Sequence, residues 1–388
     1  MKILHTSDWH LGATLHGLGR EHDHIQTLES IADIVSSEKP DAVLLTGDVF
    51  NVPQPSASSQ RLFGDTLDML LRRVPETRII VTAGNHDSGA RLEAYRRFMS
   101  RHGVTLVGKF DRENIENHIV EISGKGFVVA VPYVYERNIP SGWFAGVLAS
   151  VAGKNTRDLP IVMTAHTTVA GVSLENPGYA TDRVIGGIDA LPYEVFGSGF
   201  DYLALGHIHK PQFVAGSGRR ARYCGTPLAI SFDEVYPHGV DIIEIGKRGD
   251  VPAVRRVEIK PSMPLVTLPA RGSAVWEEVL GMLERFPDDL KAYVRLNVEV
   301  DDFLPSEAMA TAMRVAENKQ CVVCHINAVR CERNHDEYGG LTVGEFKTMA
   351  PMDIARFYAE SIGVDFSDDM ENMFSAAIQE LMEEEGDV

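Results

Sequence analysis

The sequence predicts a layered α/β fold in which buried strands alternate with amphipathic helices. Short continuous apolar runs are typical of strands that are buried on both faces. They occur at Ile3 to Thr6, Asp41 to Thr46, Arg78 to Ala83, Phe127 to Val131, Ile161 to Ala165 and Tyr202 to Leu205. Helical patterns fall between them, near residues 20–38, 57–73, 89–101 and 141–152. This is the rhythm of βαβ units, and a later group of strands near 222–259 is expected to complete the sheets.

The character of the chain changes after residue 260, where Pro261, Pro264 and Pro269 predict a linker. Proline is excluded from central strands and is common in turns. Beyond the linker, helical and strand patterns alternate at 274–285, 292–300, 305–318 and 320–330. They predict a small α+β domain.

The last part of the chain predicts two amphipathic helices, at 351–362 and 368–385. Each begins at a residue pair suited to capping. This tail is strongly acidic, with Arg356 as its one basic residue after position 350, so it is not a nucleic-acid surface. The expected parts of the chain are therefore 1–260, 265–335 and 345–388.

Composition and charge limit the class of protein. With 44% hydrophobic and 24% charged residues, the chain has the composition of a globular protein. It shows neither a run of roughly 18 apolar residues nor a signal-peptide pattern, and its four cysteines do not make a disulfide framework. We therefore expect a cytoplasmic protein. The net charge of -18 argues against binding nucleic acid through bulk electrostatics.

Five polar motifs each follow a strand-like run. They are Asp8-Trp9-His10, Gly47-Asp48-Val49-Phe50, Gly84-Asn85-His86-Asp87, His166, and Gly206-His207-Ile208-His209. In open α/β sheets, ligand sites gather outside the carboxyl ends of the strands. We therefore expect the five motifs to converge on one edge of the fold.

The candidate ligands comprise two carboxylates, one amide oxygen and four imidazoles, without a thiolate. Such a set suits manganese, iron or zinc better than calcium, and it is large enough for two ions. Two ions about 3.5 to 4 Å apart, bridged by a carboxylate, are suited to phosphodiester hydrolysis, and Asp48 is the candidate bridge. A glycine beside Asp48, Asn85 and His207 lets the backbone approach closely. One such motif alone is usually structural, but five in order favour a metal site.

These motifs, in this order, resemble the calcineurin-like metallophosphoesterase superfamily over residues 1 to about 260. More narrowly, the sequence resembles the SbcD family of bacterial nuclease subunits at Met1 to Gly12, Gly47 to Phe50, Gly84 to Ser88, Tyr202 to His209 and Tyr223 to Glu234. The resemblance implies a layered β-sandwich metallophosphoesterase core flanked by helices. It also implies a small α+β capping domain and a C-terminal helical pair that binds a partner.

The resemblance further implies the roles of the site residues. Asp8, His10, Asp48 and His209 hold one of two Mn²⁺ ions, and Asp48, Asn85, His166 and His207 hold the other. His86 is then the catalytic residue, which contacts the phosphate and protonates the leaving oxygen. The implied activity is exonucleolytic and endonucleolytic cleavage of DNA in repair and recombination, together with an SbcC-like coiled-coil ATPase. A homodimer through residues near 57–101 is implied as well.

Two other functions stay open at this point. A stand-alone small-molecule or cyclic-nucleotide phosphodiesterase would have the same metal site, but it would need neither 265–335 nor 351–385. A scaffold protein whose metal site has lapsed would not need every ligand. All seven candidate ligands and His86 are present, which favours an enzyme.

The remaining histidines near the first motif, His5, His16, His22 and His24, are expected to be structural or at the surface, because the ligand set is already complete. A zinc site is a second candidate, because Cys321-x-x-Cys324-His325 is followed by Cys331 and His335. The β-branched run between Cys321 and Cys324 instead favours a strand with packed cysteines.

Two groups of arginines are candidates for DNA contacts. Arg91, Arg96, Arg97 and Arg101 have helical spacing, which favours a solvated face. Arg219, Arg220 and Arg222 lie in a glycine-rich stretch after the last motif, and they are the better candidates for phosphate contacts.

Overall fold

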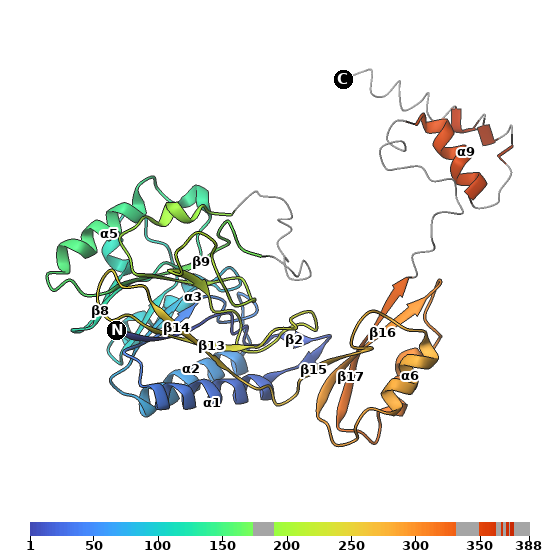
Figure 1. Ribbon diagram of the computed structural model, residues 1–388, viewed down its shortest axis with the longest axis horizontal. Helices are drawn as coiled ribbons and strands as arrows, with labels where there is room; N and C mark the ends of the chain where they lie inside the picture. The colour runs from blue at the N-terminus through green and yellow to red at the C-terminus, as the bar shows by residue number, and fades with distance from the viewer. Residues whose placement is uncertain (174–189, 331–348, 362–365, 368–369, 372, 376–388) are drawn as a thin grey trace. The chain divides into compact units, whose positions relative to one another are not determined.

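The computed structural model describes residues 1–173, 190–330, 349–361, 366–367, 370–371 and 373–375 (Figure 1). The chain forms two compact units, residues 1–298 with 304–327 and residues 299–303 with 328–388. Within the described ranges, every helix is too short or too polar to span a membrane.

A six-stranded sheet contains the first three predicted strands as parallel neighbours. Its order is β14 (Ala253–Glu258), β13 (Gly239–Glu244), β1 (Lys2–Thr6), β4 (Ala42–Thr46), β5 (Arg78–Thr82) and β6 (Val104–Val107). β13 pairs antiparallel with both β1 and β14. The register pairs Thr6 with Leu45 and Thr46 with Thr82, so the strands that carry the first three motifs end at one edge.

A second six-stranded sheet contains the strands predicted at 127–131, 161–165 and 202–205. Its order is β11 (Gln212–Phe213), β12 (Ala221–Tyr223), β10 (Tyr202–Gly206), β9 (Ile161–His166), β8 (Gly126–Val129) and β7 (Ile119–Ile122). β8, β9, β10 and β12 are parallel, and Gly206 pairs with His166. The last two motifs therefore also begin at one edge.

The two sheets face each other across a shared apolar core. Ile3, Leu44 and Ile80 of the first sheet pack there with Val162 and Tyr202 of the second. Burial on both faces explains why these strands are continuous apolar runs. The structure therefore confirms the predicted layered α/β fold.

Helices cover the outer faces of the sheets (Figure 1). α1 (Glu21–Glu38) and α2 (Ala57–Arg73) pack Leu28 and Leu67 against the first sheet. α5 (Trp143–Lys154) packs Val147 against the second sheet. The bounds of all three helices lie within two residues of the predicted ones.

The single helix predicted at 89–101 is wrong. The structure has α3 (Gly89–Leu92), a 3₁₀ turn (Glu93–Tyr95) and α4 (Arg96–Ser100). The Glu93 carboxylate accepts hydrogen bonds from the backbone N–H groups of Gly108 and Lys109, at 2.9 and 3.2 Å. These contacts to a distant segment hold the turn in its broken form. The short strands β6, β7 and β11 and the hairpin of β2 (Thr14–Leu15) and β3 (Leu18–Gly19) were not predicted.

A three-stranded sheet follows, in the order β15 (Leu265–Leu268), β16 (Ala292–Val300) and β17 (Cys321–Arg330). It is accompanied by α6 (Trp276–Glu284) and α7 (Ala308–Val315). β15 lies in the stretch predicted as a linker, so that prediction is wrong for these four residues. Pro264 and Pro269 stand just outside β15 at its two ends, where proline costs no ladder hydrogen bond. The domain boundaries themselves remain a prediction.

In the second unit, α9 (Pro351–Ser361) matches the first predicted tail helix within one residue. Residues 370–371 and 373–375 are helical as well. Arg356 donates to Glu371 at 2.5 Å, which joins these two segments. Residues 376–385 of the second predicted helix lie outside the described residues, as do Cys331 and His335.

Candidate metal centre

All five motifs meet where strands of the two sheets end. The loops after β1 and β4 are hydrogen-bonded to each other, because Asp8 N–H donates to Gly47 O and His10 N–H donates to Asp48 O, both at 3.0 Å. The second sheet reaches the same place, because His207 N–H donates to the Asp8 carboxylate at 3.1 Å. The expected convergence of the motifs is therefore present.

Three glycines allow this approach. A Cβ on Gly47 would lie 2.1 Å from His166 Nδ1, one on Gly84 would lie 2.1 Å from Asp48 Oδ1, and one on Gly206 would lie 2.0 Å from Thr46 O. Gly47 also has φ +92°, a left-handed conformation that side chains rarely adopt. The prediction that glycine lets backbone approach the site closely is confirmed.

Four of the predicted site residues have strained backbone. Asp8, His10, Asp48 and His207 have φ of 54, 45, 49 and 98°. Non-glycine residues with positive φ are uncommon, and strain of this kind persists where the surrounding structure holds it, often at functional sites. The hydrogen bonds between the β1 and β4 loops supply that support.

Asp48 lies at the centre of the cluster. Its Oδ2 is 3.3 Å from His166 Nε2 and 3.7 Å from His10 Nε2, while its Oδ1 accepts the His86 backbone N–H at 2.9 Å. Among the described residues, three groups have ligand atoms within 4.8 Å of one another. They are Asp8 with His10 and His209, Asp8 with Asp48 and His166, and His10 with Asp48 and His86. Asp8, His10 and Asp48 each belong to two of the three.

Asn85 and His207 join the cluster beside His166. The Asn85 Oδ1 atom is 3.1 Å from His166 Nε2 and 3.0 Å from His207 Nδ1. An amide oxygen therefore lies between two imidazoles. The structure brings all seven predicted ligands and His86 into one cluster.

Hydrogen bonds orient three of the imidazole rings in the same way. The Nδ1 atoms of His166, His209 and His86 face Thr46 O at 2.8 Å, Glu234 Oε1 at 2.8 Å and Asn51 O at 3.0 Å, respectively. A ring whose Nδ1–H donates to an oxygen directs Nε2 to its other side, where the Nε2 lone pair can bind a metal once the ring is neutral. These are the tautomer and orientation that metal-binding histidines use.

The chemistry of the donor set fits a divalent cation. The carboxylates of Asp8 and Asp48 are buried together, and such burial of charge is costly without a compensating cation. The Nε2 atoms of His10 and His209 face each other at 3.1 Å, and His10 Nδ1 is buried without a hydrogen-bond partner among the described residues. The cluster is thus arranged for metal coordination rather than for internal hydrogen bonding.

Burial and the neighbouring charges shift the pKa values of the side chains in the cluster. Burial disfavours protonated His166, but the Asp48 carboxylate outweighs it and raises the pKa of His166 to about 9. The pKa of His209 is likewise raised to about 9, against burial, by Glu234. Burial lowers the pKa of His207 to about 3. Burial opposes ionisation of Asp48 too, yet His166 and His10 hold its pKa below its usual range.

Two acidic residues that support the site were not identified from the sequence. The Asp87 carboxylate accepts hydrogen bonds from the backbone N–H groups of Gly84, Val49 and Phe50, at 2.9, 3.1 and 2.9 Å. It therefore joins the loops that carry Asp48 and Asn85. Asp87 is the last residue of the Gly84 to Asp87 motif. Its place in that motif is the sequence feature that could have identified it.

The second of these residues is Glu234, which holds His209. Its carboxylate also accepts the Ile230 N–H at 3.2 Å. Its neighbour Asp233 pairs with Arg295 of β16 at 2.8 Å. Consecutive acidic residues therefore contact a metal-centre imidazole and the three-stranded sheet. Glu234 ends the Tyr223 to Glu234 stretch, but nothing local to the sequence links it to His209.

The four histidines that were not expected to be ligands are structural or at the surface, as predicted. Buried His5 contacts Tyr202 Oη and Thr46 Oγ1, both at 3.1 Å, and His24 Nδ1 contacts Arg20 O at 3.0 Å. His22 is exposed. His16 stacks on His325, with ring centroids 4.1 Å apart.

The zinc interpretation gains no support from the described residues. Cys321 and Cys324 lie in β17, three positions apart, so their side chains point to opposite faces of the strand. Cys324 packs in an apolar cluster with Leu15, Phe232 and Tyr293. Both thiols are packed, as the strand pattern predicts.

Two members of the second arginine group are held by contacts within the fold, and the preference for this group as phosphate contacts stays a prediction. Arg222 forms an ion pair with buried Asp241, at 2.6 Å. Arg220 donates to three backbone carbonyls, those of Asp201, Gly249 and Asp250. Both guanidinium groups hold the fold together. In the first group, Arg91, Arg97 and Arg101 are exposed, as predicted.

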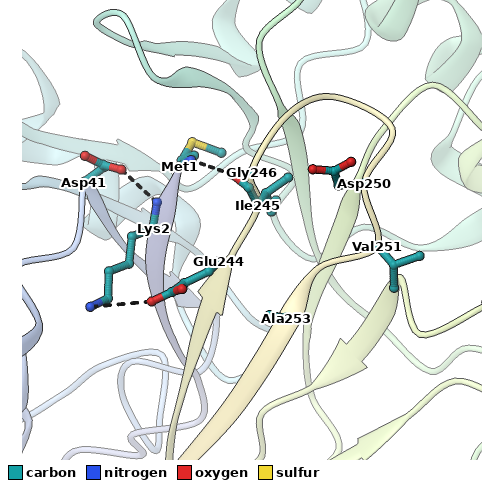
Figure 2. A pocket seen from close by; sticks show the side chains of 9 residues that line it. All are labelled: Met1, Lys2, Asp41, Glu244, Ile245, Gly246, Asp250, Val251 and Ala253. Carbon is teal, nitrogen blue, oxygen red and sulfur yellow. Dashed lines mark hydrogen bonds and ion pairs between the residues drawn. The ribbon is translucent and has the colours of Figure 1, made fainter.

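A separate pocket lies at the opposite end of β1 (Figure 2). Its lining includes Met1, Lys2, Asp41 and Glu244. Lys2 pairs with Glu244 at 3.7 Å, and the Lys2 N–H donates to Asp41 at 2.7 Å. Its charged groups thus neutralise one another, and none of the predicted site residues lines it.

Comparisons with known proteins agree with this geometry. Residues 1–211 match the model of the family described as calcineurin-like phosphoesterase. Three proteins named as the SbcD component of the nuclease SbcCD are similar over most of the chain. The protein from Rhodobacter capsulatus is 34% identical, over 75% of this chain and 78% of its own. Those from Bacillus subtilis and Escherichia coli K12 are 30% and 28% identical, over 87% and 78% of this chain and 88% and 79% of their own.

Metal binding is expected to release protons. His166 and His209, with pKa values raised to about 9 in the metal-free protein, are protonated at neutral pH and must lose these protons to bind an ion. Apparent Mn²⁺ affinity should therefore rise with pH up to about 9, by at most about tenfold per pH unit for each proton released. Calorimetric titrations in buffers of different ionisation enthalpy measure this release. An affinity independent of pH, with no proton release, would contradict the assignment.

Proposed function

The chain belongs to the calcineurin-like phosphoesterase family and, within it, to the SbcD nucleases, and from this premise we propose how its residues cut DNA. The protein is a hydrolase that acts on DNA phosphodiester bonds. One observation carries the proposal: the buried carboxylates of Asp8 and Asp48 meet four imidazoles in a single cluster. A stand-alone small-molecule phosphodiesterase is not favoured, because relatives named as components of SbcCD match up to 87% of the chain.

The family and the donor groups indicate binding of a divalent metal. We assign two Mn²⁺ ions to the cluster, with Asp48 as the bridge. Asp8, His10 and His209 complete one site, and Asn85, His166 and His207 complete the other. The position of Asp48 Oδ2 near both His166 and His10 supports the bridge, and an imidazole-rich set suits Mn²⁺ better than Mg²⁺.

Bound ions of this kind activate the attacking water and neutralise charge on the phosphate oxygens. The chain supplies positioning and one proton. His86 donates its Nδ1–H to Asn51 O at 3.0 Å, and its ring lies 5.0 Å from that of His10. Its Nε2 is then free to face the metal centre beside His10 and Asp48, where a protonated imidazole would give its proton to the leaving oxygen. Asp87 keeps this loop in place through its three backbone contacts.

We further propose that the protein acts with an SbcC-like ATPase on duplex ends and hairpins, and that it forms a homodimer through 57–101. Its relatives are named as components of SbcCD. The exposed apolar side chains of the tail support the proposal of a protein partner, because Met373 and Phe374 are 75% and 44% exposed. An amphipathic helix with an exposed apolar face is a common ligand for a partner groove. The tail's acidic charge favours a basic partner surface.

Removing His86 should separate metal binding from catalysis. His86→Ala is expected to keep both ions and to lose roughly 100-fold to 10,000-fold in cleavage rate, since it removes a proton donor. Asp48→Ala should lose at least one ion and all activity. Metal content and cleavage of single-stranded DNA are measured on the same preparations. His86 is also within reach of His10 and Asp48, so metal loss in His86→Ala would make it a ligand and overturn this assignment.

The proposed metal is tested by a series of divalent ions on a single-stranded oligonucleotide. Mn²⁺ should support much faster cleavage than Mg²⁺, because Mg²⁺ prefers oxygen ligands and retains its waters. The initial rate at saturating metal is the measurement. Equal rates with Mg²⁺ alone would mean that the imidazoles are not ligands.

Truncation tests the tail as the partner-binding segment. A chain ending at Gly344 should keep Mn²⁺-dependent cleavage of single strands but no longer co-purify with the ATPase. Met373→Ser with Phe374→Ser should weaken the complex in the full chain. Met313→Ser is the matched control, since Met313 is 59% exposed on α7. If only the α7 variant weakened the complex, the partner surface would lie within 265–335.

A further inference from the structure

The loop after β8 brings two tyrosines beside the metal centre. Tyr133 lies four residues beyond the end of β8, and its backbone N–H donates to Ala83 O at 2.7 Å. Ala83 directly precedes the segment that carries Gly84, Asn85 and His86. The loop of the second sheet is therefore fastened to the motif of the first sheet.

The rings continue this contact outward from the metal-binding residues. The Tyr133 ring lies edge to face with His166, with centroids 6.3 Å apart and planes at 80°. Tyr135 meets Tyr133 in the same manner, at 5.3 Å and 70°. His166 Nε2, in turn, faces Asn85 and Asp48. A chain of contacting rings leads from the metal centre to Tyr135.

Tyr135 presents a ring to solvent. It is 50% exposed, and the Arg137 guanidinium lies over its ring at 4.8 Å from the centroid. Neither Tyr133 nor Tyr135 belongs to the apolar core clusters of the two sheets. Core packing therefore does not explain why an aromatic ring is held at this position, two ring contacts from the metal-centre residue His166.

We propose that Tyr135, together with Arg137, is a stacking platform for an unpaired nucleobase of the DNA strand whose phosphate is at the metal centre. This inference rests on the proposed function. Aromatic rings stack on every base, and the stacking does not depend on sequence. The guanidinium adds a positive charge over one face of the ring, where a neighbouring phosphate of the same strand can bind it.

Two features of the protein favour this occupant. The ring-to-ring steps of 6.3 and 5.3 Å from His166 to Tyr135 are covered within a few nucleotides, since successive phosphates of a strand are about 3.4 Å apart along the axis even in the compact duplex. The net charge of -18 leaves little general attraction for DNA. An acidic nuclease therefore needs local contacts to hold a DNA strand. A base can stack on the Tyr135 ring only when it is unstacked from the duplex, which favours an unpaired base.

The test is steady-state cleavage of a single-stranded oligonucleotide by the full chain with Mn²⁺. Tyr135→Ala should raise KM about tenfold, the scale of one lost base–aromatic stack, while kcat and metal content stay unchanged. Tyr135→Phe should retain the wild-type KM, because the ring is kept. Phe303→Ala removes an 87% exposed aromatic ring of the other compact unit and serves as the matched control.

A second substrate separates stacking from a structural role. An oligomer of the same length, with abasic units in place of every nucleotide, should be cut equally by the wild type and by Tyr135→Ala. An equal loss on both substrates, or loss of metal in Tyr135→Ala, would overturn the inference, as would an unchanged KM on normal DNA. Failure of the wild-type protein to cut DNA with Mn²⁺ would instead overturn the proposed function itself.

Discussion

The burial of Asp8 and Asp48 in one place is the constraint on which the rest of the site depends. Both carboxylates are almost inaccessible to solvent, and like charges buried together are costly unless cations compensate them. In the metal-free protein, protonated imidazoles provide part of that compensation, since the pKa values of His166 and His209 are raised to about 9. Divalent ions would replace those protons. The same electrostatic demand thus links proton binding, metal binding and stability of the centre.

The opposed sheets make this arrangement rigid. The first sheet contributes Asp8, His10, Asp48 and Asn85, and the second contributes His166, His207 and His209. A shared apolar core holds the sheets together, and its side chains are almost completely buried. Glycines at the strand ends then let the two sets of loops meet, although the loops carry strained backbone. The packing energy of the core therefore maintains the backbone strain at the site.

The acidic character of the chain suggests how its functions are divided. A protein of net charge -18 cannot rely on its general field to attract DNA. In the proposed complex, contacts to the substrate come instead from the metals, from Tyr135 and Arg137, and from a partner. The positive side chains of Arg220 and Arg222 are not available for this purpose, because they hold together segments of the catalytic sheets. An acidic surface is in turn suited to a basic protein partner.

The sequence by itself determined the layered α/β fold, the strands that carry the motifs, and the side chains that meet at their ends. These are local properties, since apolar runs encode buried strands and each candidate ligand directly follows or ends one. Only the tertiary structure decided which distant side chains support them. Glu234 lies 25 residues from His209 and reaches it through the fold, and Tyr133 lies beside His166 because β8 and β9 are neighbouring parallel strands of the second sheet. Likewise, the break at Glu93 and the pairing of Arg222 with Asp241 depend on neighbours that are remote in the sequence. Such contacts follow from how the sheets stack, which no local pattern encodes.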